Sequence, residues 1–274
     1  MEVVTRRIGT ALGVCGVLVY LVFALYPVGW MLLISLKSTS EMFNTGLVFQ
    51  PTLQNYSAVV LHSPFLRAVG NSLIVSVGAV LIALVVSVPA AYALARFPFR
   101  GRESLAFTFL SFRFAPALLI AMPLYIIYQK IGLFDTRWGL IWVYQLIAVP
   151  FIIWILRSYF ADISEEMEYA GYLDGYSRGQ VFVKLVLPLV RPGLMAASLL
   201  SFIFCWNAFT FPLVLSGSQV PIDTVISLNY LATTSVHYGE LGAVAIISAI
   251  PEVVLAIAIR KHLVTGLSFG AIKG

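Results

Sequence analysis

Charged and chemically reactive residues are scarce in this chain. Only 11% of its 274 residues are charged and 60% are hydrophobic, whereas a water-soluble domain carries about a quarter charged residues. Three histidines and two cysteines form no metal-ligand spacing, and Cys15 and Cys205 both lie in apolar runs, where they behave as small hydrophobic thiols. The sequence therefore predicts no metal centre and no disulfide framework, and it indicates a surface that faces lipid.

A phosphate-binding loop is also missing, because no Gly-rich stretch is followed by Lys-Ser or Lys-Thr. The chain is therefore not expected to hydrolyse ATP by itself. Its net charge of +5 does not indicate nucleic acid, since the basic residues are scattered between the apolar runs. Catalysis by the few carboxylates would need a pocket that shifts their pKa values, and no His or metal-ligand cluster accompanies them.

Long apolar runs are what the sequence does contain. A helix of about 20 apolar residues can cross a hydrocarbon core of roughly 30 Å and satisfies its own backbone hydrogen bonds. We predict an all-α integral membrane protein with a single transmembrane domain over residues 1–274. Its six predicted spans are Ile8–Leu36, Val69–Ala95, Leu105–Tyr128, Trp138–Tyr159, Leu185–Leu215 and Leu241–Val264. Pro188 and Pro192 predict a bend in the first turns of the long fifth span.

Basic residues are distributed unevenly between the two sets of connections. The poorer set holds only Lys37, Arg67, Lys130 and Arg137. The richer set holds Arg6, Arg7, Arg96, Arg100, Arg102, Arg157, Arg178, Lys184, Arg191, Arg260, Lys261 and Lys273. The positive-inside rule places the richer set in the cytoplasm. Both termini and a polar insert at 160–184 are then predicted to be cytoplasmic.

The first half of this insert has the signals of a short helix. Ser164 is a good N-cap, and Glu165 and Glu166 fall in the first turn, where the helix dipole favours carboxylates. Asp174-Gly175 then predicts a tight turn, since Gly tolerates positive φ.

A second helix is predicted to follow, because Ser177 and Gln180 have the spacing of a capping box. The local prediction is helix, turn, helix at the cytoplasmic surface, which indicates a docking surface for a soluble partner. An ordinary polar loop with incidental capping residues fits the same spacing.

The insert resembles the EAA loop of the permease subunits of binding-protein-dependent ABC importers. The Glu-Ala-Ala pattern and its following Gly correspond to Glu168-Tyr169-Ala170 and Asp174-Gly175. Phe182, Leu187-Pro188 and Pro192-Gly193 continue the resemblance in the manner of the carbohydrate branch of that family. Tyr169 and Tyr176 stand where the family commonly has Ala, which puts the fit to a particular ATPase in doubt.

Three further stretches extend the resemblance over most of the chain. Trp206-Asn207-Ala208-Phe209 is similar to a motif in the fifth span of sugar permeases, and Gly132-Leu133-Phe134-Asp135-Thr136 is similar to their external turn. The tail at 265–274 resembles the C-terminus of MalG-type permeases. The SugB-type permeases of mycobacterial disaccharide importers, such as the trehalose system, are also similar, although the sequence does not determine the sugar.

This resemblance implies the type I fold of ABC importer permeases and a location in the bacterial inner membrane. It implies a heterodimer with a second permease subunit, two ATPase subunits, an extracytoplasmic sugar-binding protein and a sugar substrate. ATP and Mg would be bound by the ATPase subunits, and this chain would bind no cofactor. The residues implied to couple to the ATPase are Glu165, Glu166, Glu168, Tyr169, Ala170, Gly171, Asp174 and Gly175.

The tail and three polar or aromatic residues within spans are further candidates. Resemblance implies that Gly270 and Lys273 contact the ATPase pair, although a frayed end is the simpler interpretation. A charge within a span, as at Arg113, faces a cavity or a partner, so Arg113 either lines the translocation path or pairs with Glu252.

Trp206 and Asn207 either contact the sugar or pack and hydrogen-bond between helices.

Two other classes of function compete with the importer subunit. A secondary transporter or channel working without ATPase subunits is the main alternative, and the docking loop and tail argue against it. A membrane-embedded enzyme is a more distant alternative, because no catalytic constellation is present.

Overall fold

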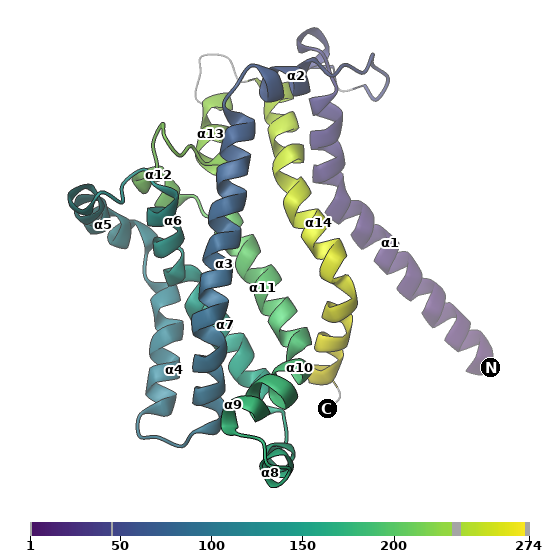
Figure 1. The fold of residues 1–274 in the computed structure, drawn as a ribbon. Helices are drawn as coiled ribbons and strands as arrows, with labels where there is room; N and C mark the ends of the chain where they lie inside the picture. The colour runs from purple at the N-terminus through teal and green to yellow at the C-terminus, as the bar shows by residue number, and fades with distance from the viewer. Residues whose placement is uncertain (1, 45, 232–236, 272–274) are drawn as a thin grey trace. The chain divides into compact units, whose positions relative to one another are not determined.

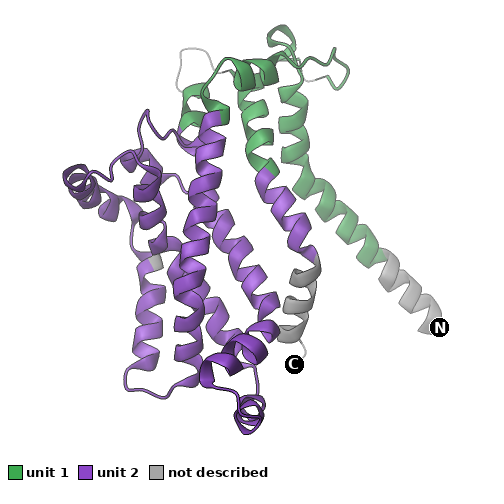
Figure 2. Ribbon diagram, viewed as in Figure 1, with its two compact units in different colours: residues 1–66, 226–250 green, residues 67–225, 251–274 purple. Residues whose placement is uncertain are grey.

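The computed structural model describes residues 2–44, 46–231 and 237–271, with side chains for all of these except residues 2–11, 113 and 261–271. All regular structure in the described residues is helical (Figure 1). The chain divides into two compact units, residues 1–66 with 226–250 and residues 67–225 with 251–274 (Figure 2). The all-helical prediction is therefore confirmed for the part of the chain that is described.

The first unit contains α1 (Glu2–Ser35), a 3₁₀ turn η1 (Thr39–Glu41), α2 (Gln54–Leu61), η4 (Ser227–Tyr230) and the start of α14 (Tyr238–Ala271). Hydrogen bonds attach the segment after α1 to the rest of this unit. The Asn55 amide donates to the carbonyls of Ser35 and Lys37, and the buried Lys37 ammonium donates to the Asn44 and Gly46 carbonyls.

The second unit contains most of α3 (Phe65–Arg96) and the elements that follow it. These are α4 (Arg102–Ser111), η2 (Phe112–Phe114), α5 (Ala117–Ile131), α6 (Arg137–Val143), α7 (Gln145–Ala161), α8 (Glu165–Leu173), α9 (Arg178–Val181), the π turn η3 (Phe182–Val186), α10 (Leu187–Leu189), α11 (Arg191–Trp206), α12 (Thr210–Leu215) and α13 (Asp223–Ile226). The helix α7 packs along α11, and α12 packs against α5.

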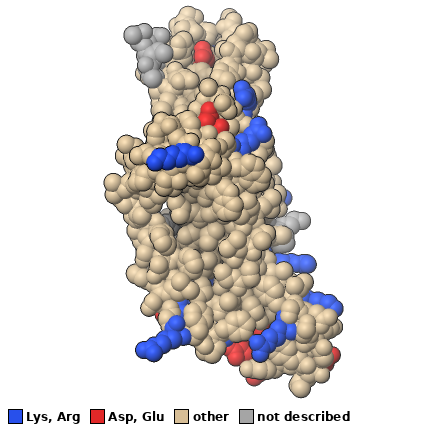
Figure 3. Space-filling model, turned by 60° about the vertical axis from the view of Figure 1, so that its left-hand side comes forward, with Lys and Arg blue, Asp and Glu red and all other residues tan. Residues whose placement is uncertain are grey.

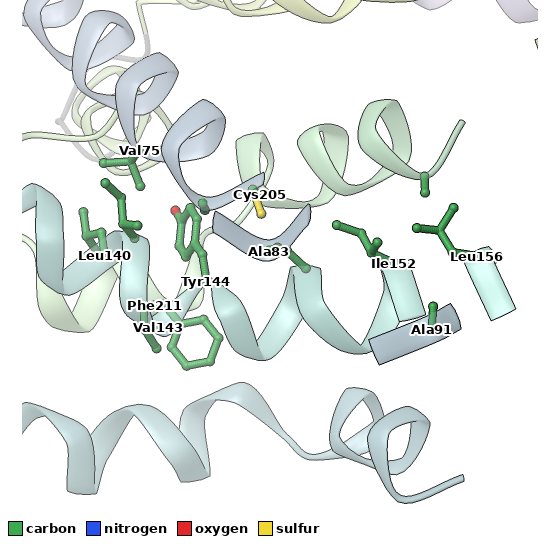
Figure 4. Packing of buried hydrophobic residues seen from close by; sticks show 14 of the residues in the cluster. Val75, Ala83, Ala91, Leu140, Val143, Tyr144, Ile152, Leu156, Cys205 and Phe211 are labelled. Atoms are coloured by element: carbon green, nitrogen blue, oxygen red, sulfur yellow. The ribbon is translucent and has the colours of Figure 1, made fainter. Parts of the chain in front are cut away.

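The core of the second unit lies among α3, α6, α7, α11 and α12 (Figure 4). Small residues of α3, including Ala83 and Ala91, let the helices approach closely, as is common where membrane helices pack. The Tyr144 ring and the side chains of Ile152 and Leu156 fill the space that they leave.

Four helices in the described residues are long and apolar enough to cross a membrane, namely Leu12–Ser35, Phe65–Arg96, Arg137–Ala161 and Tyr238–Arg260. A fifth is present if Arg178–Leu189 and Arg191–Trp206 count as one span, although the two are bent by 72° relative to each other. The predicted bend near Pro188 and Pro192 is therefore confirmed. The multi-span class is confirmed, but the described residues hold four or five candidate spans by length and composition where six were predicted.

The predicted third span at 105–128 is not one continuous helix. The helix α4 ends at Ser111, a 3₁₀ turn follows, and Ala115 and Pro116 adopt extended ψ angles of 129° and 117° before α5 begins. Proline disfavours the α conformation of the residue before it, so Pro116 accounts for this break. The fifth predicted span, at 185–215, is also interrupted, because α11 ends at Trp206 and α12 begins at Thr210.

Candidate functional site

The polar insert folds into the helix that its caps predict. The Ser164 hydroxyl accepts a hydrogen bond from the Glu166 N–H at 3.2 Å, and α8 runs from Glu165 to Leu173. Carboxylates in the first turn interact favourably with the positive end of the helix dipole. The prediction of a helix at this position is confirmed.

A Schellman turn ends this helix. Gly175 has a φ of 87°, and its N–H donates to the Tyr172 carbonyl, while the Tyr176 N–H donates to the Gly171 carbonyl, both at 3.1 Å. This pair of bonds is the usual way for a helix to end on a left-handed glycine. The turn predicted at Asp174-Gly175 is therefore present.

The second helix begins with the predicted capping box. The Ser177 N–H donates to the Gln180 side chain at 2.9 Å, and the Gln180 N–H donates to the Ser177 hydroxyl at 3.4 Å. After one turn of α9 the chain continues into the π turn, a form that occurs frequently at functional sites. The predicted helix–turn–helix of the polar insert is therefore confirmed as local structure.

The inner side of α8 packs closely against this second helix. A Cβ placed on Gly171 would lie 2.6 Å from Leu185 Cδ1 and 3.0 Å from Val181 Cγ2, so only glycine allows this approach without a shift. Tyr172 packs against the core of the second unit. The two helices of the insert therefore form a packed pair.

A buried polar cluster joins α8 to α3. Arg96 Nε donates to Glu168 Oε1 at 2.5 Å and forms an ion pair with this carboxylate. Arg96 Nη2 donates to the Ile163 carbonyl at 2.6 Å. The Tyr92 hydroxyl donates to Glu168 Oε2 at 2.6 Å. We call Tyr92, Arg96 and Glu168 the Glu168 cluster. Buried carboxylates are normally paired in this way, because an unpaired buried charge is costly.

The other predicted coupling residues are mostly on the solvent side. Glu165, Glu166, Ala170, Asp174 and Gly175 are exposed, and Gly171 and Glu168 are buried. Large apolar side chains stand among the exposed ones, with Leu173 89%, Tyr169 60% and Met167 44% exposed. We call Glu165, Glu166, Met167, Tyr169 and Leu173 the α8 surface.

Charged side chains accompany the α8 surface. Figure 3 is turned about the vertical axis only, so its lower end is the end at which α8 lies in Figure 1, and blue and red atoms gather there on the visible face. The combination of exposed apolar side chains and flanking charges is typical of protein-interaction sites.

The candidates within the spans occupy different environments. Trp206 is only 2% exposed and its ring stacks on Phe202 with centroids 5.7 Å apart. Asn207 is exposed, and its amide donates to Ile203 and to the Glu252 carboxylate of α14. Trp206 thus packs, and Asn207 bonds a neighbouring helix.

Three candidates lie wholly or partly outside the described residues. Arg113 lies in the 3₁₀ turn at the break after α4, but its side chain is outside the described residues. Gly270 lies in the last turns of α14, and Lys273 is outside the described residues. Their roles stay predictions.

Both helix breaks border one cavity of about 280 Å³. Phe112 and Ala115 line it from the first break, and Ala208 and Phe209 line it from the second.

The described residues contain no group of three or more His, Cys, Asp or Glu side chains that could hold a metal ion.

The sequence did not point to the partners of Glu168. Tyr92 and Arg96 lie 76 and 72 residues from it, and no local pattern links them. Glu252 accepts from the Asn207 amide, and the predicted pairing of Glu252 with Arg113 stays a prediction because the Arg113 side chain lies outside the described residues. Two polar residues within apolar runs, Asn207 and Glu252, were the only signal of this contact in the sequence.

A family model described as "Binding-protein-dependent transport system inner membrane component" matches residues 83–268. The chain is 35% identical to the trehalose transport system permease protein SugB of Mycobacterium tuberculosis (strain CDC 1551 / Oshkosh), over 92% of this chain and 93% of that protein. It is 31% identical to the trehalose/maltose transport system permease protein MalG of Thermococcus litoralis, over 100% and 99% of the two chains.

A crystal structure of a bacterial ABC transporter involved in the import of the acidic polysaccharide alginate has a similar fold. One of its chains superposes with a TM-score of 0.77 at 24% identity, over 94% of this chain and 98% of that one.

The chain belongs to the family of inner membrane components of binding-protein-dependent ABC transport systems. It is a multi-span permease subunit of the inner membrane, and the family's membrane component binds no cofactor itself. Membership implies an ATPase and a binding protein as partners.

Proposed function

We propose that this permease subunit forms half of the pathway of an ATP-driven sugar importer, paired with a second and different permease subunit. Two curated relatives named for trehalose or trehalose and maltose transport support a sugar as cargo. In this proposal the chain crosses the membrane six times, with the interrupted stretch at 105–128 as the third span. Both termini lie in the cytoplasm, as the distribution of Lys and Arg indicates.

The α8 surface is the single observation that carries coupling to the ATPase. Leu173 and Tyr169 expose large apolar side chains on a helix that caps, a Schellman turn and packing through Gly171 hold in place. A preorganised apolar helix flanked by carboxylates fits a groove on a soluble partner. Glu165, Glu166, Tyr169 and Ala170 would contact the ATPase, and Asp174-Gly175 would set the angle at which the chain returns to α9.

Glu168 and Gly171 would contribute to this coupling from the buried side of α8. Gly270 and Lys273, at the end of the chain, would add a contact to the ATPase pair. ATPase closure could then displace α8 and the helices attached to it as rigid bodies.

Asn207, Trp206 and Arg113 would belong to the translocation path in this proposal, with Trp206 supporting its wall. Exposed polar groups within apolar helices face a water-filled path or a partner helix rather than lipid. The hydrogen bond from Asn207 to Glu252 adds a carboxylate to this candidate wall.

Purification in a mild detergent tests the proposal first. An ATPase subunit should remain bound to the chain, and the reconstituted complex should take up labelled sugar only when ATP is supplied. A panel of labelled mono- and disaccharides that includes trehalose and maltose would identify the cargo. Uptake driven by an ion gradient, without any bound ATPase, would instead indicate a secondary transporter.

A further inference from the structure

We propose that the Glu168 cluster is a mechanical link between α8 and α3, in which Glu168 is a positioning residue rather than a contact to the ATPase. The inference rests on the proposed function, because it concerns the route by which displacement of α8 reaches the spans. It assigns to Tyr92 and Arg96 a role that the sequence did not indicate.

Both oxygens of the Glu168 carboxylate are engaged inside the chain. Oε1 accepts from Arg96 Nε at 2.5 Å, and Oε2 accepts from the Tyr92 hydroxyl at 2.6 Å. The side chains of Arg96 and Glu168 are only 7% and 8% exposed. A partner protein could reach this carboxylate only after the pair had separated, and separation would leave a buried Arg96 without its counter-charge.

Arg96 holds two points on the segment that carries α8. Its second contact is to the carbonyl of Ile163, which precedes the N-cap Ser164, while Glu168 lies one turn into the helix. Contacts before and within the first turns restrict both the rotation and the translation of α8 relative to the end of α3. The covalent connection alone attaches α8 to α7 and α9, not to α3.

An aromatic cluster surrounds the linking side chains. The Tyr92 ring lies 5.5 Å from the Phe160 ring of α7 and 4.7 Å from the Phe182 ring of the π turn. The Tyr92 hydroxyl therefore donates to Glu168 from a ring on α3 that packs against both α7 and the π turn. Rings packed in this way have little freedom to follow α8 without moving their own helices.

Other residues of α3 lie in the core of the second unit, against which Tyr92 also packs. Ala79, Ala83 and Ala91 on this helix are fully buried there, in the cluster that also contains Leu140 and Ile152. A displacement of α8 that α3 follows would therefore shift the packing of the core. Coupling between separated sites normally travels through such packed elements and hydrogen-bonded pairs.

The experiment compares Glu168→Gln, Arg96→Gln and the double variant in the complex reconstituted with its partner subunits. Uptake of labelled trehalose, maltose and glucose is measured beside ATP hydrolysis. Each single variant should retain the ATPase on purification, yet its uptake per ATP hydrolysed should fall by at least about fivefold, the lower range of typical coupling. The double variant should be no worse than the worse single one, since both disable the same pair.

Tyr92→Phe provides a variant that keeps the ring and removes only the hydroxyl. It should also lower uptake per ATP hydrolysed. Tyr128→Phe is the matched control, because the Tyr128 hydroxyl donates to the Gly139 carbonyl away from this cluster. If the charged variants do not fold, the comparison of these two tyrosines decides the question.

Three results would overturn the link. The first is a ratio of uptake to hydrolysis that stays at the wild-type value in Glu168→Gln and in Tyr92→Phe. The second is loss of the ATPase in Glu168→Gln but not in Arg96→Gln, which would make Glu168 a docking residue. The third is additive loss in the double variant. A wild-type complex without any bound ATPase would overturn the proposed function, and this inference with it.

Discussion

The backbone N–H of Gly217 donates to Asp135 Oδ1 at 2.7 Å, across 82 residues of sequence. The same carboxylate accepts from the N–H groups of Gln219 at 2.9 Å and of Val220 at 2.9 Å, and the Asp135 N–H donates to the Leu215 carbonyl. The buried Asp135 carboxylate thus accepts three backbone hydrogen bonds from the loop at 216–222. Asp135 adopts a positive φ of 54°, which asparagine and aspartate tolerate better than most residues.

Replacing this carboxylate should loosen the loop at 216–222. Asp135→Ala removes the acceptor of three backbone N–H groups and should destabilise the protein by about 1–3 kcal/mol or more. The thermal unfolding midpoint in detergent should fall, and limited proteolysis should cleave the loop sooner. Asp174→Asn, at an exposed turn, is the control. An unchanged midpoint in Asp135→Ala would show that other contacts suffice to hold the loop.

Gly175→Val should impair coupling, because valine strains the positive φ at this position although there is room for its side chain. A left-handed φ costs a non-glycine residue roughly 1–2 kcal/mol, and no atom other than its chain neighbours lies within 4 Å of a Cβ placed there. We expect reduced uptake in vesicles, through loss of coupling or of assembly.

Gly179→Val is the matched control for this variant, since Gly179 also has open space around its Cβ position but has no positive φ. Normal uptake by Gly175→Val would contradict the role given to the turn.

Leu173→Asp should weaken binding of the ATPase without unfolding the permease. Leu173 is the most exposed apolar residue of the α8 surface, so its removal leaves no cavity within the chain. Loss of an apolar hot-spot residue costs an interface more than about 1 kcal/mol, so the Kd should rise about tenfold if Leu173 is such an anchor. Titration of the purified permease complex with the ATPase measures this. Equal binding by Leu173→Asp and wild type would exclude Leu173 from the interface.

The Glu103–Arg157 ion pair should make a small, pH-dependent contribution to stability. The Arg157 hydrogen bond holds the pKa of the Glu103 carboxyl below its ordinary value. A carboxyl with a lowered pKa in the folded state stabilises the fold above its unfolded pKa, and this stabilisation is lost as pH falls through the folded value.

The unfolding midpoints of wild type and Glu103→Gln should therefore differ at neutral pH and converge in acid. A difference that persists at a pH below the folded pKa of Glu103 would rule out this source. The effect should be small because Glu103 is on the surface, where solvent screens the pair.

Local features of the coupling segment were predictable because neighbouring residues determine them. The N-cap at Ser164, the capping box at Ser177 and the turn at Gly175 all depend on side chains within a few positions of the backbone groups that they satisfy. The helical class and the bend near Pro188 follow from composition and from proline geometry in the same way.

The break at Pro116 is an instructive difference. A hydropathy pattern records apolarity but not backbone geometry, so the stretch at 105–128 was predicted as one span. The residue before Pro116 adopts an extended ψ, and the helix divides there. Pro116 alone did not predict the break, because Pro89 and Pro150 lie inside uninterrupted helices of the same chain.

The sequence by itself therefore determined the membrane class, the helix–turn–helix of residues 165–181 and the family, since these depend on composition, short-range capping and motif. Only the tertiary structure decided which faces are free. It turned Glu168 inward to Arg96 and left Glu165, Tyr169 and Leu173 outside, and it paired Asp135 with a loop far along the chain. Helix packing determines such contacts, because it places residues distant in sequence side by side, and no local sequence pattern predicts them.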